Sequence, residues 1–340
     1  MKVKLGKALE YEQPSKYIVE SEKYKDEYKT PVLTAGKSFI LGYTNETTGI
    51  YNNLPVIIFD DFTTDVKFVD FPFKVKSSAM KMLQPSSNEY NLKYFYYLIK
   101  FLNFQPTSHQ RHWISKFAEF EFNIPDRQKQ DEIVEKLDKM AEILSLKDKE
   151  LKKYDELIKS QFTEMFENKN FEQVLLSEVI DYEQPTKYIV ASENYKDEYE
   201  TPVLTAGKSF ILGYTNETEG IYNGSINPTL IFDDFTTDCK YVDFDFKVKS
   251  SAMKLLHLRN NSEQILYYFY AINKIRFKPE NHQRHWISKF ANFTIEKPPI
   301  EQQTQFANFV KHIDKLKFSI KQSIEKLENC YNSLMQKYFN

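Results

Sequence analysis

Residues 126–166 read DRQKQDEIVEKLDKMAEILSLKDKELKKYDELIKSQFTEMF, and this stretch decides how the chain is organised. Neither Pro nor Gly interrupts it, and most of its residues favour helix. Apolar or large side chains recur at alternating spacings of four and three, with weak positions at Lys147 and Gln161. These seam residues are Ile133, Leu137, Met140, Leu144, Leu151, Tyr154, Ile158 and Met165. A period near 3.5 predicts a helix of roughly 60 Å with a narrow apolar seam that requires a partner.

The partner is expected within the same chain, because almost the whole sequence occurs twice. A run of 40 residues that begins at Tyr11 returns from Tyr182, and 35 of its positions are identical. Such self-similarity is typical of an internal repeat. The repeated blocks are residues 11–50 with 182–221, 59–83 with 232–256, and 109–120 with 282–293. The offset between the copies shifts by two residues near Asn53, where the second copy carries a longer loop at Gly224–Pro228.

A second long helix is expected from about Ile300 to Phe339, because its seam repeats the first in phase. Its seam residues are Phe306, Val310, Ile313, Lys317, Ile320, Ile324, Leu327, Tyr331, Leu334 and Tyr338. The matching seams favour an antiparallel intramolecular pair over an interaction stalk or a homodimer zipper. The predicted order is globular domain, long helix, globular domain, long helix, at residues 1–125, 126–168, 169–298 and 299–340.

Each copy is expected to be an α/β or α+β domain with a mixed sheet. Short apolar or β-branched runs bounded by turn residues predict the strands, and aromatic runs predict packed helices. The predicted strands are Pro31–Thr34, Ser38–Tyr43, Val56–Phe59 and Thr229–Phe232, with Val66–Val75 as a strand or hairpin. The predicted short helices are Tyr94–Leu102 and Ile265–Ile275. The expected fold class is therefore two similar domains separated by two long antiparallel coiled-coil helices, with internal pseudo-two-fold symmetry.

The composition excludes some protein classes. Charged residues make up 28% and aromatic residues 16% of the chain, which is typical of a globular rather than a disordered protein. The net charge of −2 argues against a histone-like polycation but leaves local basic patches open. Cys239 and Cys330 have no Cys counterpart in the other copy, so both are expected to be free thiols in a reducing compartment. Without a signal peptide or an apolar run of membrane length, the protein is expected to be cytoplasmic.

Two motifs resemble enzymatic sites, but in both cases the surrounding residues favour a structural or DNA-facing role. Gly36-Lys37-Ser38 resembles the end of a phosphate-binding loop, but Pro31 occupies the position of the required earlier Gly. Asp60, Asp61 and Asp65 with Lys67 resemble the carboxylate cluster of a metal-dependent nuclease. Asp and Thr at a strand end are more often turn formers, so a structural turn or a DNA-facing loop is the preferred interpretation.

The segment HQRHWISK at residues 109–116 favours nucleic-acid contact. No Cys or further His accompanies its His-x-x-His spacing, which argues against a zinc site. Arg, Gln and His side chains can contact phosphates and base edges. The competing interpretation makes Trp113 and Ile114 core residues and the remainder a solvated turn. The chain also lacks a methyl-donor loop, a methyltransferase tetrapeptide, a helicase box and a nucleophile elbow, so no catalytic residue and no metal ligand is predicted.

The order and duplication of these segments resemble the specificity (S) subunit of type I restriction–modification enzymes. One segment looks like the start of the family's conserved helix, since it consists of Ile124-Pro125 followed by Gln128, Gln130, Ile133-Val134 and Lys136-Leu137-Asp138. Pro298-Pro299-Ile300-Glu301-Gln302 repeats that start. Lys2–Gly6 and Leu175–Ile180 resemble the family's lead-in to each recognition domain. At the start of the first helix, Asp126-Arg127 stands where the family usually has Pro and Glu.

The resemblance implies a function and a set of partners. Each globular domain would be a target recognition domain for one half of a split site on double-stranded DNA. The helices would set the spacing and dock two methyltransferase (M) subunits, which use S-adenosylmethionine to modify a flipped adenine. Restriction (R) subunits would supply ATP- and Mg²⁺-dependent cleavage. No cofactor and no membrane contact is expected for this chain itself.

The expected DNA contacts fall on equivalent positions of the two copies, and because the readers are near-copies, an interrupted palindrome is the predicted target. In the first copy these are Lys37, Ser38, Tyr43, Thr44, Asn45, Thr63, Thr64, His109, Gln110, Arg111, His112 and Lys116. In the second copy they are Lys208, Ser209, Tyr214, Thr215, Asn216, Thr236, Thr237, His282, Gln283, Arg284, His285 and Lys289. Salt-sensitive phosphate contacts are expected from lysines such as Lys37, Lys76 and Lys81.

Two further hypotheses follow. Residues 1–168 hold one reader and one helix, so two copies of that fragment could rebuild a working pseudo-subunit. The competing function is a structural adaptor that does not bind DNA and carries two identical ligand-binding heads on a coiled-coil stalk. A gel shift with a methyltransferase partner separates the two functions.

Overall fold

The computed structural model describes residues 2–34, 38–106, 110–205, 209–279 and 283–340. The chain forms two compact units. Unit 1 comprises residues 1–148 and 322–340, and unit 2 comprises residues 149–321. Each unit therefore combines one copy of the repeat with parts of both long helices.

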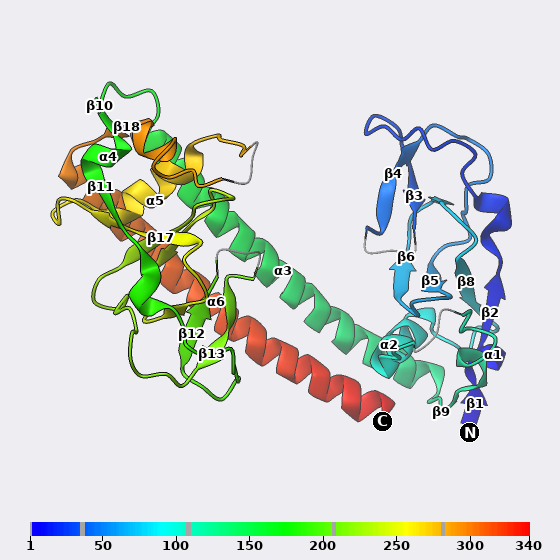
Figure 1. Cartoon of the computed structure of the whole chain (residues 1–340). Helices are drawn as coiled ribbons and strands as arrows, with labels where there is room; N and C mark the ends of the chain where they lie inside the picture. The colour runs from blue at the N-terminus through cyan, green and yellow to red at the C-terminus, as the bar shows by residue number, and fades with distance from the viewer. Residues whose placement is uncertain (1, 35–37, 107–109, 206–208, 280–282) are drawn as a thin grey trace. The chain divides into compact units, whose positions relative to one another are not determined.

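Unit 1 contains two main sheets (Figure 1). The first is antiparallel and has the order β2 (Leu9–Glu12), β8 (Met80–Pro85), β5 (Val56–Asp60) and β6 (Val66–Val69). The second has the order β4 (Ile40–Thr44), β3 (Thr30–Leu33) and β7 (Lys74–Val75). Strand β3 pairs antiparallel with β4 and parallel with β7, so this sheet is mixed.

Shorter elements complete unit 1, and α2 covers the antiparallel sheet. The Asn91 side chain caps α2 by accepting hydrogen bonds from the backbone N–H groups of Lys93 and Tyr94, and Asn103 ends the helix in the left-handed conformation. Phe95 and Leu98 on its inner face join Phe59 of β5 in the core. The remaining elements are β1 (Lys2–Lys4), α1 (Leu5–Ala8), η1 (Pro14–Tyr17), α2 (Leu92–Leu102), η2 (Phe117–Glu119) and β9 (Glu121–Asn123).

Unit 2 repeats this element order. Its antiparallel sheet consists of β11 (Ile180–Glu183), β17 (Met253–Leu258), β14 (Thr229–Asp233) and β15 (Cys239–Val242). Its mixed sheet consists of β13 (Ile211–Thr215), β12 (Thr201–Leu204) and β16 (Lys247–Val248). The other elements are β10 (Glu172–Leu175), α4 (Leu176–Val179), η3 (Pro185–Tyr188), α5 (Ile265–Lys274), η4 (Phe290–Asn292) and β18 (Thr294–Lys297).

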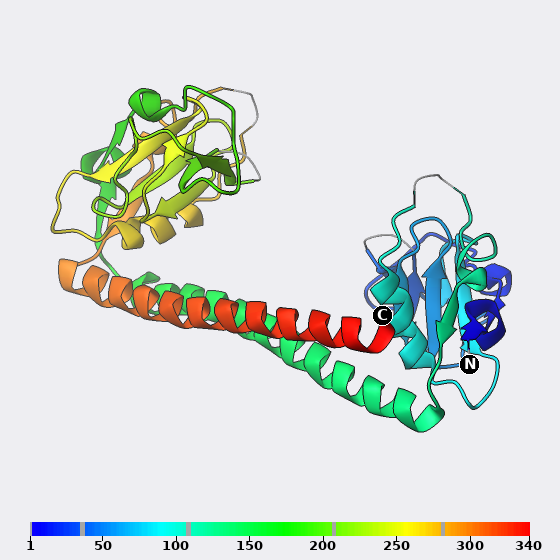
Figure 2. The same cartoon turned by 90° about the horizontal axis from the view of Figure 1, so that it is seen from below.

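The long helices α3 (Arg127–Phe166) and α6 (Ile300–Phe339) pack together inside each unit. In unit 1, Leu137 near the start of α3 shares a core with Phe339 at the end of α6, whose ring centroid lies 5.2 Å from that of Tyr94. Figure 2 shows the red end of α6 beside α2. In unit 2 the opposite ends meet, and the rings of Phe162 and Phe306 lie 5.4 Å apart. The predicted antiparallel pair and the predicted fold class are therefore confirmed.

One glutamine in each unit ties a long helix to its domain. The Gln130 side chain accepts a hydrogen bond from Asn91 N at 2.7 Å and donates to Pro125 O at 2.9 Å. Gln303 makes the matching contacts to Gln264 N at 3.0 Å and to Pro298 O at 2.9 Å. Both side chains are buried, so the Pro-to-Gln spacing in the sequence serves to fix the helix start to the short helix beside it.

Two details of the sheet prediction were wrong. The segment Val66–Val75 is neither one strand nor a hairpin, because β6 and β7 belong to different sheets. The Asp70-Phe71-Pro72 break lets the chain leave the antiparallel sheet and pair with β3 in the mixed one. Each copy therefore has an antiparallel sheet and a mixed sheet where the sequence predicted a single mixed sheet. Both cysteines are free, as predicted. Within the described ranges, no helix is both long and apolar enough to cross a bilayer.

Candidate nucleic-acid interface

Backbone hydrogen bonds bring several candidate segments to one end of the two sheets in unit 1. Lys76 N, just after β7, donates to Leu33 O at the end of β3, at 2.8 Å. Asp61 N, just after β5, donates to Ala79 O at 3.0 Å, and Asp61 O accepts from His112 N at 2.8 Å. We call this surface the rim; it comprises residues 38–39, 60–65, 76–79 and 110–116 in unit 1.

Unit 2 builds the same rim from its own copy. Lys249 N donates to Leu204 O at 2.9 Å, and Asp234 O accepts from His285 N at 2.8 Å. Its segments are residues 209–210, 233–238, 249–252 and 283–289. Residues that are far apart in sequence are therefore brought together by the same contacts in both copies.

The acidic residues of the rim have separate structural roles. The Asp60 side chain accepts hydrogen bonds from Phe62 N at 2.8 Å and Thr63 N at 3.1 Å, which closes the turn after β5. Thr64 completes that turn with a positive φ of 64°. Asp65 is exposed, whereas Asp61 points inward. This arrangement supports the structural turn over the carboxylate cluster of a nuclease.

A buried ion pair anchors the loop that carries residues 110–116. The Asp61 carboxylate lies 3.1 Å from Lys81 Nζ, and the two side chains are 0% and 1% exposed. Asp61 Oδ1 also accepts a hydrogen bond from Trp113 N at 2.8 Å. In unit 2, Asp234 lies 3.2 Å from Lys254 Nζ and accepts from Trp286 N at 2.8 Å.

The expectation that Lys81 contacts phosphate was therefore wrong, because its ammonium lies inside the protein, 4.6 Å from the Tyr11 ring centroid. The sequence contained a usable signal. Lys81 interrupts the apolar run Met80–Leu83, and Asp61 follows the apolar strand β5. A charge inside an apolar strand implies a buried partner of opposite sign. Lys76 also has a carboxylate partner, since its ion pair with Glu22 raises the pKa of Lys76.

Arg111 lies at the surface above the buried pair. One of its guanidinium nitrogens is 3.8 Å from the Asp61 carboxylate, and its guanidinium carbon is 5.8 Å from the Phe62 ring centroid. The side chain is 49% exposed. In unit 2, Arg284 has the same exposure and lies 3.8 Å from Asp234 and 5.9 Å from the Phe235 ring. Each guanidinium is thus oriented by a carboxylate and an aromatic ring of the protein, while about half of the Arg side chain remains exposed to solvent.

The rest of the loop presents polar and apolar groups together. Gln110 and Lys116 are exposed, and Lys116 Nζ lies 4.9 Å from the Phe104 ring centroid. Trp113 is buried, as the solvated-turn interpretation expected, but Ile114 is 60% exposed and was wrongly assigned to the core. Ile287 repeats this at 61%. An exposed aliphatic side chain beside Arg and Lys suits contact with a ligand that has both charged and apolar parts.

Some predicted contact residues are buried, which corrects their assignment to the surface. Thr44 Oγ1 accepts a hydrogen bond from Glu46 N at 3.2 Å, and Thr64 Oγ1 donates to Phe104 O at 3.0 Å. The His112 ring packs 5.6 Å from the Phe104 ring. The buried members of the predicted set are Thr44, Thr64, His112, Thr215 and His285. Thr237 is half-buried. The side chains of Thr64, His112 and His285 support the fold beneath the rim, whereas Thr44 and Thr215 lie at the far ends of β4 and β13.

Other predicted residues lie away from the rim or outside the described ranges. Tyr43 and Asn45 are at the opposite end of β4 from Ser38, because β4 runs antiparallel to β3. Tyr214 and Asn216 occupy the same places in unit 2. Lys37, His109, Lys208 and His282 fall outside the described residues. The exposed rim residues that remain are Ser38, Thr63, Gln110, Arg111 and Lys116, with Ser209, Thr236, Gln283, Arg284 and Lys289.

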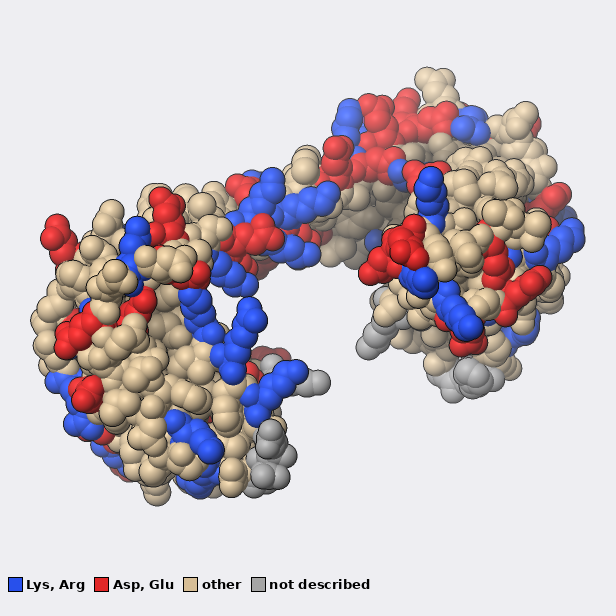
Figure 3. Space-filling view, turned by 90° about the horizontal axis from the view of Figure 1, so that it is seen from above, with Lys and Arg blue, Asp and Glu red and all other residues tan. Residues whose placement is uncertain are grey.

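The charge of the surface is mixed. On the face shown in Figure 3, blue Lys and Arg side chains and red Asp and Glu side chains are both scattered among tan residues. This agrees with the net charge of −2. Any attraction for a polyanion must therefore come from local groups of basic side chains such as those of the rim.

A family model and a curated relative both relate this chain to type I restriction specificity proteins. The model of the type I restriction modification DNA specificity domain matches residues 1–153 and 168–329. The specificity subunit of the Escherichia coli type I restriction enzyme EcoR124I/EcoR124II is 53% identical over 128 residues. That alignment covers 37% of this chain and 31% of the relative, so the chain matches about a third of the relative's length.

Two solved structures share the fold. The S subunit of a type I restriction–modification system from M. genitalium superposes with a TM-score of 0.68 at 16% identity, over 100% of this chain and 96% of that one. A chain from a structure that concerns the complex assembly and conformational transition of the type I R-M system superposes with a TM-score of 0.52 at 12% identity, over 98% of both chains. At these identities the likeness concerns the fold.

Proposed function

We propose, from the premise that this chain belongs to the type I restriction–modification DNA specificity family, that it reads the DNA target of such a system. In this proposal the chain is the non-catalytic subunit of a methyltransferase–endonuclease complex. Each unit reads one half of a bipartite site on double-stranded DNA. The observation that carries the proposal is the duplicated rim, where Arg111 and Arg284 are held by the same contacts.

The chemistry of the rim suits base readout. An Arg side chain can donate two hydrogen bonds to the O6 and N7 atoms of guanine in the major groove. The ring of Phe62 and the carboxylate of Asp61 restrict where the Arg111 guanidinium can point, which lowers the entropy lost on binding. Gln110 and Thr63 add neutral donors and acceptors, and Lys116 adds a charge for phosphate.

The duplication also supports a specific kind of target. The distances that position Arg284 differ from those of Arg111 by about 0.1 Å or less. Base identity is read by few side chains, so equivalent readers select equivalent half-sites. We therefore propose an interrupted palindrome, with a spacer set by the lengths of α3 and α6.

The partners and cofactors of the proposed complex follow from the family. Two methyltransferase subunits would dock on the long helices and bind S-adenosylmethionine. Restriction subunits would bring ATP and Mg²⁺. The residues of this chain would then place the partners on the DNA without contributing to bond making or breaking.

Adenine methylation mapping tests this function. The chain is co-expressed with its methyltransferase partner, and modified sites are sequenced in cells with and without the gene. We expect one interrupted palindrome that disappears without the gene. We also expect Arg111→Ala and Arg284→Ala to relax the same base position, since the two variants change equivalent readers. Lys7→Gln, an exposed change at the far end of the sheet, serves as the control and leaves the motif unchanged.

Two results would contradict parts of this proposal separately. A motif with unrelated half-sites, or single variants that relax different bases, would refute the palindrome while leaving DNA reading intact. Normal methylation without the gene, together with no gel shift of any duplex in the presence of the methyltransferase, would refute DNA reading and favour the adaptor.

A further inference from the structure

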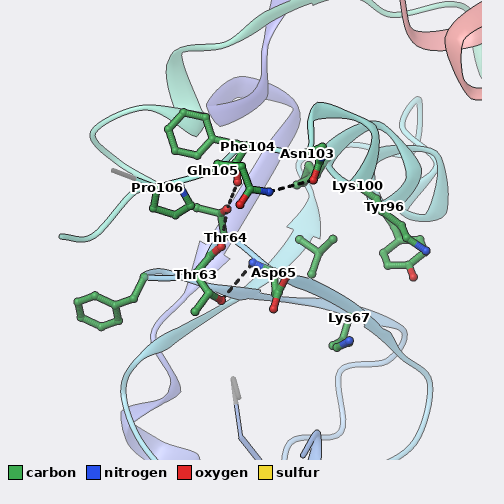
Figure 4. Close-up of a pocket in the computed structure, with 13 residues that line it drawn as sticks. Thr63, Thr64, Asp65, Lys67, Tyr96, Lys100, Asn103, Phe104, Gln105 and Pro106 are labelled. Carbon is green, nitrogen blue, oxygen red and sulfur yellow. Dashed lines mark hydrogen bonds between the residues drawn. The ribbon is translucent and has the colours of Figure 1, made fainter. Parts of the chain in front are cut away.

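A polar hollow lies directly beside the rim of unit 1. It has a volume of about 830 Å³ and lies between the turn after β5, strand β6 and the C-terminal end of α2. Figure 4 shows its polar side chains, with Lys67 and Lys100 on one side and Thr63 on the other. The polar residues of its lining are Thr63, Thr64, Asp65, Lys67, Lys100, Asn103 and Gln105.

Two lysines of the hollow lack a carboxylate partner. Among the described residues, none places a carboxylate oxygen within 4.0 Å of Lys67 Nζ or Lys100 Nζ. Partial burial and the neighbouring charge of Lys67 lower the pKa of Lys100 from its ordinary value. Both lysines are nevertheless exposed as whole side chains, so their ammonium groups can reach solvent. Two positive charges held near each other favour the binding of an anion between them.

The hollow matches one phosphodiester in charge and in hydrogen-bond donors. Its lining carries two ammonium groups and one carboxylate, that of Asp65, so a single negative charge neutralises it. Asn103 and Gln105 are joined by a hydrogen bond of 3.1 Å, and each amide keeps N–H groups for a phosphate oxygen. The volume far exceeds the roughly 30 Å³ of a water molecule, so a sugar–phosphate unit can enter without displacing the protein.

The hollow shares its wall with the proposed base reader. Phe62, whose ring lies 5.8 Å from the Arg111 guanidinium, also lines the hollow. Phe104 lines it as well and lies under Lys116. DNA held by the rim must therefore pass next to Lys67 and Lys100.

The second copy is also basic in this region, but its basic residues are three where the first copy has two, and they occupy partly different positions. Lys67 corresponds to Lys240, whereas Lys100, Asn103 and Gln105 are replaced by Asn273, Arg276 and Lys278. Lys240, Arg276 and Lys278 are all exposed. Base readers must match atom for atom, but a phosphate contact needs only a positive charge within reach. The variation is therefore typical of backbone contact.

We propose that Lys67 and Lys100 bind a backbone phosphate of the DNA immediately outside the bases that unit 1 reads. This proposal rests on the proposed function and adds a contact that carries affinity but no sequence information. It assigns the hollow to DNA phosphate and the rim arginine to base identity.

The test measures the dissociation constant of the chain with its methyltransferase partner on a duplex that carries the methylated motif. Lys67→Gln, Lys100→Gln and the double variant are compared between 50 and 200 mM salt. Each phosphate charge neutralised contributes a slope of about 0.9 to the logarithmic salt dependence. We expect the slope of the double variant to fall by about 0.9, because the two lysines hold one phosphate, with specific and non-specific duplexes weakened equally and the methylation motif unchanged. Lys7→Gln, at the other end of the sheet, should leave the slope as in the wild type.

A phosphate arm identifies the anion. Chloride is replaced by inorganic phosphate at equal ionic strength, and we expect phosphate to weaken DNA binding by the wild type more than by the double variant, because free phosphate competes with the DNA for the two lysines. Stronger inhibition of the wild type with an unchanged DNA slope would assign the hollow to free phosphate and overturn the proposal. Unchanged slopes in a complex that still reads its motif would also overturn it, without affecting the proposed function. Altered base preference in Lys67→Gln or Lys100→Gln would equally contradict it. Failure of the wild-type complex to bind any duplex would instead remove the proposed function.

Discussion

The buried Asp61–Lys81 pair predicts a large and local effect of a single isosteric change. In Asp61→Asn, the amide oxygen can still accept the hydrogen bond from Trp113 N, while the negative charge is lost and the amide NH2 replaces the oxygen that faces Lys81. Lys81 then keeps an ammonium that is 1% exposed and has lost its carboxylate partner at 3.1 Å. Leaving one member of a buried pair without its partner costs about 3–5 kcal/mol.

That loss is a large fraction of the stability of unit 1. Domains of this size have unfolding free energies of about 5–15 kcal/mol. The Tyr11 ring lies 4.6 Å from Lys81 Nζ in the wild type, so its cation–π contact is present before and after the change and offsets nothing new. The double change Asp61→Asn/Lys81→Met removes both charges and should recover most of the loss.

Hydrogen exchange measured by mass spectrometry distinguishes a loss of stability in unit 1 from a loss in unit 2. Peptides from β5 and β8 should lose protection in Asp61→Asn, while those from β14 and β17 keep it. Asp234→Asn should give the reverse pattern, because Asp234 and Lys254 form the equivalent pair at 3.2 Å. A loss of less than about 1 kcal/mol in Asp61→Asn, a value within reach of an exposed pair, would contradict the cost expected for a buried pair. A double variant that is no more stable than the single variant would contradict that cost as well.

Three further predictions concern the core, the pH response and the helices. Leu137→Ala should lower the unfolding free energy in urea by about 2–5 kcal/mol, because Leu137 is fully buried; a loss near zero would contradict its place in the core. Burial opposes ionisation of Glu46, but Lys74 and the backbone N–H groups of Ser21 and Glu20 outweigh it, so the pKa of Glu46 lies below its ordinary value of 4.5. The stability that the Glu46 carboxylate contributes is complete above pH 4.5 and is lost as the pH falls through the lowered pKa. The melting temperature of Glu46→Gln should therefore fall less steeply in acid than that of the wild type. Melting temperatures of the two proteins that fall in parallel would argue against the ion pair between Glu46 and Lys74. Seven residues inserted at matched positions in α3 and α6 should change the spacer of the methylated motif and keep its half-sites, and altered half-sites would contradict this division of labour.

Much of the fold could be predicted because the repeat and the seam are strong one-dimensional signals. Leu137 and Val310 were predicted as equivalent seam residues, and both are buried. Phe162 and Phe339 lie off that seam but are also buried, because each packs against a short helix of its domain. A seam identifies the contact between two helices, whereas contacts to a third element depend on tertiary structure.

The candidate interface was harder to predict, because side chains within one loop differ in burial. His112 and Arg111 are neighbours in sequence, yet His112 is buried and Arg111 is half exposed. The direction of each is set by Asp61, which is about fifty residues away in the chain and binds the loop backbone. Lys67 and Lys100 were not predicted as DNA contacts, since only the packing of α2 on β6 brings them into one hollow.

The composition of unit 1 has a consequence for how the protein is made. Its core includes Met335 and Phe339, which are translated long after its two main sheets, since these are complete by Pro85. The first domain must therefore remain partly uncovered while unit 2 is translated and folds. A ribosome that stops before residue 322 would release a chain whose first domain exposes the apolar surface normally covered by α6. The translation of α6 thus acts as a checkpoint, because only a chain that carries residues 322–340 covers its first domain.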